Sequence, residues 1–374
     1  MNLKYGNEII ESDEEEAFRS WYRPGAEFFV MMLIILIVLV FVTLRASTKS
    51  VMISESSKGI SGESIFEEDV VTGWVVMQVI DNDDSGKIIV PLPLTARSEN
   101  ISVENYCQDH TLFIRIRGAS SAGFENTSIG GDTGHIKTAA YREYAGEIRI
   151  SLLMDGVWDF EIQRDNSSLV ISPYKAEEKY ENILLLVADK PRQSQDEEIP
   201  DLTSENITNA IAEKASDLMS LTGNADETAS VANSEANKKS RIYVAEYRSD
   251  ADILSFADEC GADMVIFLDT AMSGDANEYG LEACYNDNFF LPDMDNATLA
   301  ESFLRNIAVS SKNRANSITA AEEGSVLYEM KVPAAKITVG YLSNETEGKY
   351  LSMDQYRNSI AEGIVNAVKE VTEK

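Results

Sequence analysis

The feature that most constrains the fold is the C-terminal half of the chain, where short apolar runs alternate with amphipathic stretches. The runs 183–187 and 264–268 contain only apolar residues, which is typical of strands buried on both faces of a sheet. Within 207–218, apolar residues recur at the spacing of one helix face. Strands interleaved with helices predict an α/β sheet covered by helices on both faces over residues 182–374.

Local signals mark where some of these helices begin and end. Ser249 or Asp250 precedes a short helical stretch as a cap, and Gly261 ends that stretch. Ser352 and Gln355 stand at the spacing of a capping box before an apolar helical pattern. We therefore expect the last helix to open at Ser352 and to bury one face.

The preceding region, 66–175, has a different pattern. Apolar and polar residues alternate along stretches such as 112–117 and 148–153, as in half-buried strands, and glycine and Asn/Asp clusters separate them. One of these clusters, 81–86, has the acidic spacing of an EF-hand loop, but its twelfth position is Leu92, where calcium needs a glutamate. The region therefore predicts a small all-β domain in which 81–86 is a turn.

A membrane anchor is predicted near the N-terminus. Residues 28–44 form an uncharged apolar run that, at ~1.5 Å per residue, just spans a bilayer core. An acidic tail, 1–27, precedes the run, and a polar stalk, 45–65, follows it. The length of the run and the acidic tail favour an uncleaved transmembrane helix over a cleaved signal peptide, whereas the balanced flanking basic residues leave the orientation open.

Charge and rare residues exclude several functions. The net charge of −31, from 63 acidic and 32 basic residues, opposes attraction to phosphates, so nucleic-acid binding is excluded. The cysteines are too few and too scattered for a disulfide framework or a zinc motif, although a bridge between Cys260 and Cys284 is left open. The two histidines, His110 and His135, lie in the β-rich region with no second ligand nearby in sequence.

Two C-terminal segments carry a resemblance to a known family. Residues 332–368, with the core VGYLSN at 339–344, closely resemble the last strand, loop and helix of zinc-dependent N-acetylmuramoyl-L-alanine amidases, which are peptidoglycan hydrolases of bacterial cell walls. Residues 257–286 resemble the central strand of that family and its following strand. Residues 146–173 resemble, more faintly, the AMIN domain that precedes many of these amidases. Together with the predicted anchor at 28–44, the resemblance implies a bacterial membrane protein with a single span and extracytoplasmic C-terminal domains.

The resemblance also implies where a catalytic site would lie. Family members hold a zinc ion with two histidines and a glutamate, and a further glutamate acts as general base. The two histidine positions fall at Arg192 and Asp269 of this chain. The glutamate ligand falls at Ser204 or, with a shift of one residue, at Glu205, and the general base falls at Thr338. These residues line the former site, and because the zinc ligands of the family are missing, we expect no bound zinc and no other cofactor.

No histidine occurs between residues 182 and 374, so no alignment can restore a two-histidine zinc site. Three functional hypotheses are compatible with this loss. The first is an amidase-like pseudoenzyme that binds peptidoglycan, a cell-wall hydrolase, or a division or sporulation protein. Its binding groove is expected at Asp269, Glu282, Thr338 and Asn344. The second hypothesis is an active amidase with relocated catalytic residues. The third is an interaction module that works through the β-rich domain.

Overall fold

The structure is a computed structural model. It describes residues 73–122, 124, 126–165, 167–189, 203–224, 240–287 and 294–373. Residues Trp74–Lys374 form one compact unit. No helix among the described residues is long and apolar enough to cross a membrane, and the anchor predicted at 28–44 lies outside them.

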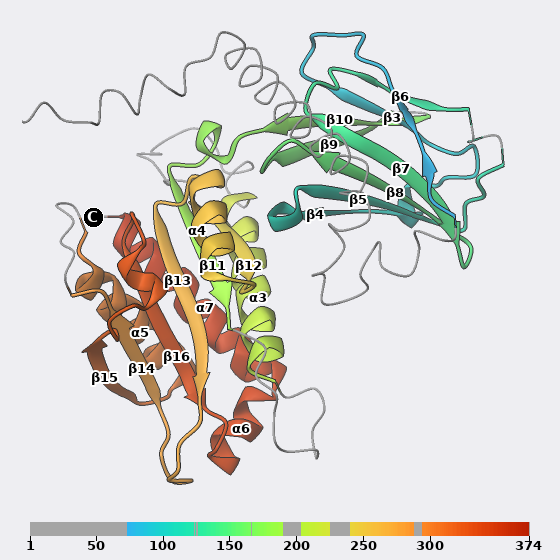
Figure 1. The fold of residues 1–374 in the computed structure, drawn as a ribbon. Helices are drawn as coiled ribbons and strands as arrows, with labels where there is room; N and C mark the ends of the chain where they lie inside the picture. Colours follow the sequence, from blue (N-terminus) through green and yellow to red (C-terminus); the bar gives the residue numbers. More distant parts are fainter. Residues whose placement is uncertain are drawn as a thin grey trace, which may run out of the picture. The chain divides into compact units, whose positions relative to one another are not determined.

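The β-rich region folds into two five-stranded sheets (Figure 1). The first has the order β1 (Val75–Val76), β7 (Ile136–Tyr144), β8 (Glu147–Met154), β5 (Thr111–Arg117) and β4 (Ile101–Tyr106). The second has the order β2 (Gln78–Val79), β6 (Ser128–Gly131), β3 (Ile88–Pro91), β10 (Ser168–Tyr174) and β9 (Asp159–Asp165). Alternate residues of both sheets, such as Ile88, Ile114 and Ile150, meet in one core, as the period of two in the sequence predicts.

The C-terminal half contains a six-stranded sheet (Figure 1). Its order is β12 (Ser240–Glu246), β11 (Asn182–Ala188), β13 (Met264–Ala271), β16 (Ala334–Tyr341), β14 (Leu281–Tyr285) and β15 (Ala315–Ala320). The strands from β12 to β16 are parallel, whereas β14 runs antiparallel to β16 and parallel to β15. The two apolar runs at 183–187 and 264–268 form the central strands β11 and β13, which are buried on both faces.

Helices cover both faces of this sheet, as predicted. On one face, α3 (Ser204–Asn224), α5 (Asn296–Ser311) and α7 (Asp354–Thr372) share a core with the strands. On the other face, α4 (Asp250–Glu259) packs together with Val157 and Ala176 of the β-rich region. A short helix, α6 (Glu345–Leu351), follows β16. Short 3-10 helices are also present: η1 (Ser98–Asn100), η2 (Cys107–Asp109), η3 (Ala176–Glu178) and η4 (Val326–Tyr328).

The helix signals in the sequence have different outcomes. The Ser249 side chain accepts a hydrogen bond from the backbone N–H of Asp252 and caps α4, and Gly261 has a φ of 65° just after that helix, as predicted. The predicted capping box at Ser352 is wrong. Ser352 ends α6, where its hydroxyl donates to the carbonyl of Lys349, and α7 begins after Met353 without a side-chain cap. Ser352 is therefore the C-cap of α6 and not, as the sequence pattern predicts, the N-cap of α7.

Candidate functional site

Three of the predicted site residues lie in one row across neighbouring strands. Asp269 of β13 is the Cα partner of Thr338 of β16, and Thr338 is the partner of Glu282 of β14. Paired residues of adjacent strands point to the same face of a sheet, so the three side chains share one face. Asp269 and Thr338 are buried. The row (Asp269, Thr338 and Glu282) lies where the family resemblance places the catalytic site.

A lysine of the same chain contacts the row. Lys336 stands two residues before Thr338 on β16 and therefore shares its face. The Nζ of Lys336 lies 3.3 Å from the Oδ2 of Asp269, and the side chains are 44% and 9% exposed, respectively. A positive charge thus compensates the carboxylate that occupies the second histidine position. Lys336 is not among the site residues predicted from the sequence, although the period of two along β16 places it on this face.

Two further side chains near the row are held in their protonated forms. Burial, together with a hydrogen bond to Glu282, raises the pKa of the Tyr341 phenol. Burial also raises the pKa of the Cys284 thiol, while the positive charge of Lys336 acts in the opposite direction. A protonated thiol is a poor nucleophile. Neither group is therefore activated for attack on an amide at neutral pH.

The start of α3, where a glutamate ligand is expected, is a buried hydrogen-bond network. Ser204 is the first residue of α3 and is 1% exposed. Its hydroxyl donates to the Oδ2 of Asp189 at 2.5 Å and accepts a hydrogen bond of 2.6 Å from the hydroxyl of Thr270. Glu205 follows, and burial, Glu246 and Asp189 all raise the pKa of its carboxyl. The Ser204 hydroxyl therefore joins β11, β13 and α3.

The donors at these positions do not fit a hydrolytic zinc, which needs three protein ligands and one open position. Asp269 contacts an ammonium group, and Ser204 and Thr338 offer only hydroxyls. Within the described parts of the chain, no group of three His, Cys, Asp or Glu side chains is placed to hold a metal ion. Arg192, at the first histidine position, lies outside the described residues.

The histidines and cysteines do not assemble elsewhere. The Nε2 of His110 lies 2.7 Å from an oxygen of Glu259, and the Nδ1 of His135 lies 3.2 Å from an oxygen of Asp155. All three cysteines are free thiols, so the bridge left open between two of them is not formed. The acidic cluster at 81–86 lies in the connection between β2 and β3, and the chain bends at Ser85 and Gly86, where the N–H of Ser85 donates to the Oδ1 of Asp83.

Asn344, the fourth residue of the predicted groove, belongs to a different place. Its Oδ1 accepts hydrogen bonds from the N–H groups of Thr346 and Glu347, and its Nδ2 donates to the carbonyl of Ala276. It lines a cavity of about 760 Å³, whose lining does not include the row Asp269, Thr338 and Glu282. The structure therefore divides the predicted groove into two separate places.

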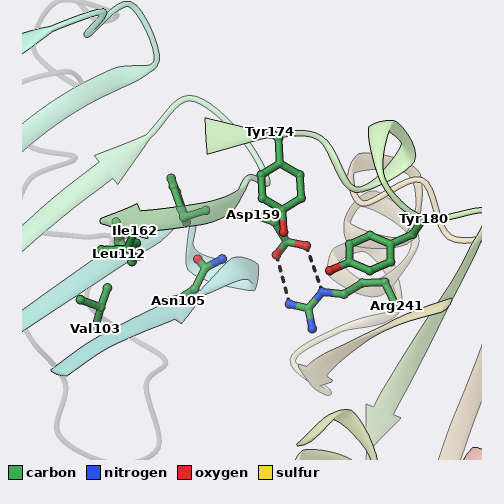
Figure 2. Close-up of a pocket in the computed structure, with 9 residues that line it drawn as sticks. Val103, Asn105, Leu112, Asp159, Ile162, Tyr174, Tyr180 and Arg241 are labelled. Carbon is green, nitrogen blue, oxygen red and sulfur yellow. Dashed lines mark hydrogen bonds and ion pairs between the residues drawn. The ribbon is translucent and has the colours of Figure 1, made fainter. Parts of the chain in front are cut away.

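A smaller cavity of about 250 Å³ surrounds a buried ion pair (Figure 2). Arg241 of β12 donates from Nε and Nη2 to the two carboxylate oxygens of Asp159, at 3.0 and 3.1 Å. Burial opposes the charge of Arg241, but Asp159 raises the pKa of the guanidinium above its ordinary value. Apolar side chains such as Leu112 and Ile162 line the rest of the cavity together with Asn105, Tyr174 and Tyr180. Because each member of the pair binds the other, we interpret this place as structural.

Comparisons with known proteins give a family and a set of similar structures. The N-acetylmuramoyl-L-alanine amidase model (Amidase_3) matches residues 197–370. The catalytic domain of CwlV, an amidase from Bacillus (Paenibacillus) polymyxa, is 18% identical over 51% of this chain and 98% of that chain, with a TM-score of 0.40. An amidase from Clostridium difficile 630 is 19% identical over 52% and 97% of the chains, with a TM-score of 0.41. No curated protein sequence matches the chain.

A third similar structure was solved together with another protein. The CwlD amidase from Clostridioides difficile, in complex with the GerS lipoprotein, is 17% identical to this chain. The match covers 51% of this chain and 98% of that chain, with a TM-score of 0.38.

Proposed function

From the premise that residues 197–370 belong to the N-acetylmuramoyl-L-alanine amidase family, we propose that this chain is an amidase-like pseudoenzyme of the bacterial cell envelope. It binds peptidoglycan, or a cell-wall hydrolase or a division or sporulation protein, and does not cleave the amide bond. In this proposal the apolar run 28–44 anchors the chain in the membrane, and the folded C-terminal part faces the cell wall.

The ion pair between Lys336 and Asp269 is the observation that carries the proposal. The family chemistry needs a cation at this position that holds a water molecule open to the substrate. A lysine ammonium contributes charge but cannot hold and activate water as a metal does. Thr338, at the general-base position, has no carboxylate to accept a proton from water. These replacements support loss of the zinc mechanism with retention of the fold.

The hypothesis of an active amidase with relocated catalytic residues has less support from the side chains near the row. Amide hydrolysis without a metal requires an activated nucleophile or a well-placed base. The nearest thiol, Cys284, has a raised pKa because of its burial, and therefore carries little thiolate. Glu282 forms a hydrogen bond with the Tyr341 phenol, so its carboxylate is already engaged within the fold. These observations favour binding without cleavage.

The test measures metal content, cleavage and binding with one preparation. Full-length protein in mild detergent is analysed for zinc by mass spectrometry, incubated with purified sacculi with and without added zinc, and then sedimented with them. We expect no stoichiometric zinc, no release of stem peptide, and retention of the protein in the pellet. A catalytically active amidase of the family provides the positive control for peptide release.

Two outcomes contradict the proposal. Stoichiometric zinc together with stem-peptide release would establish an active amidase, and loss of that release in Asp269→Ala would place its chemistry at the row. Retention on sacculi that survives Asp269→Ala, Glu282→Ala and Thr338→Ala, and that also survives Tyr279→Ala and Tyr350→Ala, would instead favour binding through the β-rich domain.

A further inference from the structure

A second candidate place for ligand binding, outside the row, is the cavity of about 760 Å³ beside α6. The position of α6 is shown in Figure 1. The cavity is formed where the loop between β13 and β14, the turn after α5, the start of α6 and the start of α7 meet. Its volume falls in the ~300–1,000 Å³ range of small-molecule sites. Neither the mechanism of the family nor the proposed pseudoenzyme function explains why the fold builds a cavity here.

Three tyrosines give the cavity aromatic walls. Tyr279 and Tyr350 are 45% and 50% exposed, and Tyr356 is half-buried. The rings of Tyr350 and Tyr356 lie with their centroids 5.6 Å apart and their planes inclined by 33°. The guanidinium of Arg314 lies 4.9 Å from the centre of the Tyr279 ring and fixes its orientation. Large rings that stay partly exposed in a concave place can bury the apolar face of a ligand.

The base of the cavity is rigid because a buried carboxylate ties its segments together. Glu347 is buried and accepts hydrogen bonds from the N–H of Tyr341 at 2.7 Å and from the Nδ2 of Asn313 at 2.6 Å. It also accepts from the N–H of Gly280, at 3.1 and 3.2 Å to its two oxygens. All of these donors belong to the protein, so both carboxylate oxygens of Glu347 are engaged within the fold. The cavity is therefore preorganised.

The rim offers polar groups that the fold does not use. Among the described residues, the hydroxyls of Tyr279 and Tyr350 and the ammonium of Lys312 have no hydrogen-bond partner. A phenol both donates and accepts, which suits a ligand that carries hydroxyl groups. The overall charge of −31 opposes the approach of polyanions, whereas a neutral ligand experiences no such repulsion.

We propose that this cavity binds a saccharide. A sugar ring presents one face of C–H groups, which can stack on Tyr279 or Tyr350, and a rim of hydroxyls, which can bind phenols and the Lys312 ammonium. The inference deepens the proposed function, since the glycan strand of the cell wall is the saccharide available to an envelope protein. It assigns recognition of the sugar to the cavity beside α6 and leaves the row of Asp269, Thr338 and Glu282 without a sugar contact.

The experiment uses chitotetraose, an uncharged N-acetylated tetrasaccharide, as the probe in calorimetric titrations of full-length protein. Tyr279→Ala and Tyr350→Ala remove the two exposed rings. The control is Tyr144→Ala, which removes a 59% exposed tyrosine of β7 outside the cavity. We expect each cavity variant to weaken binding by roughly tenfold and the control to leave it unchanged. Tyr350→Phe, which keeps the ring, is expected to weaken binding less than Tyr350→Ala.

Absence of heat from chitotetraose at millimolar concentration overturns the proposal, and so does binding that is equal in the cavity variants and the control. Sedimentation with sacculi separates this failure from failure of the proposed function. If the protein sediments with sacculi but does not bind chitotetraose, saccharide binding by the cavity is contradicted and the pseudoenzyme proposal stands. If the protein binds chitotetraose through the cavity tyrosines and also releases stem peptide with zinc, saccharide binding by the cavity is supported and the pseudoenzyme proposal is contradicted.

Discussion

Lys336 and Asp269 face each other across adjacent parallel strands, with 3.3 Å between Nζ and Oδ2. The carboxylate is nearly buried, whereas the lysine side chain reaches it from a partly exposed position. A buried carboxylate without a partner is costly, so the lysine permits Asp269 to occupy the end of a strand that is otherwise apolar. The ion pair therefore stabilises the strand end and places an ammonium beside Asp269.

The first prediction concerns this ion pair. Lys336→Met removes the ammonium that pairs with the nearly buried Asp269 carboxylate, and we expect the free energy of unfolding to fall by about 1–2 kcal/mol. Lys331→Met is the matched control, because Lys331 pairs with Asp258 at an exposed place and should contribute less than ~0.5 kcal/mol. Urea titration measures both changes. Equal losses in the two variants would contradict a special role for the buried pair.

The second prediction concerns the glycine of the VGYLSN motif. Gly340 has a φ of 149°, and a Cβ there would lie 2.9 Å from the Cδ of Glu347. We expect Gly340→Ala to lower the free energy of unfolding by about 2–4 kcal/mol, because backbone strain and overpacking add. At Gly274 nothing lies within 4 Å of an added Cβ, so Gly274→Ala should change stability little. Thermal unfolding measures the stability of both variants, and similar melting temperatures would contradict the predicted cost at Gly340.

The third prediction concerns the buried pair in Figure 2. Arg241→Met leaves Asp159 as an uncompensated buried charge, so we expect a loss of about 3 kcal/mol in the free energy of unfolding. Arg248→Met is the control, since its partner Asp109 is more exposed than Asp159. The double variant Arg241→Met, Asp159→Leu should recover much of the loss, as a buried pair can often be replaced by apolar residues. No recovery in the double variant would assign the loss to packing.

The fourth prediction concerns the pH dependence of thiol alkylation. Burial raises the pKa of Cys107 and of Cys260 to about 12, and it also raises the pKa of Cys284. A raised pKa keeps the thiol protonated, so iodoacetamide should modify the native protein slowly at pH 8 and rapidly after unfolding in guanidinium. The positive charge of Lys336 lowers the pKa of Cys284, so Lys336→Met should slow the alkylation of Cys284 further. Mass spectrometry of the alkylated peptides resolves the three sites, and fast native labelling of Cys284 would contradict the expectation.

Several features could be predicted because they depend on neighbours in sequence. The apolar runs that form β11 and β13, and the Ser249 cap of α4, follow from side-chain period and local hydrogen bonding. The start of the last helix could not be predicted in this way. Ser352 offers a suitable cap, but the chain forms α6 first, and the helix that contains Lys349 uses the Ser352 hydroxyl at its own end.

The sequence by itself determined the α/β class of the C-terminal half and the absence of histidine from residues 182–374, since both are properties of composition and spacing. Only the tertiary structure decided which side chains meet. The register between β13 and β16 brings Lys336 to Asp269, and the buried carboxylate of Glu347 gathers the segments around Asn344 into a separate cavity. Strand register and long-range hydrogen bonds are set by packing of the whole sheet, which no local pattern contains.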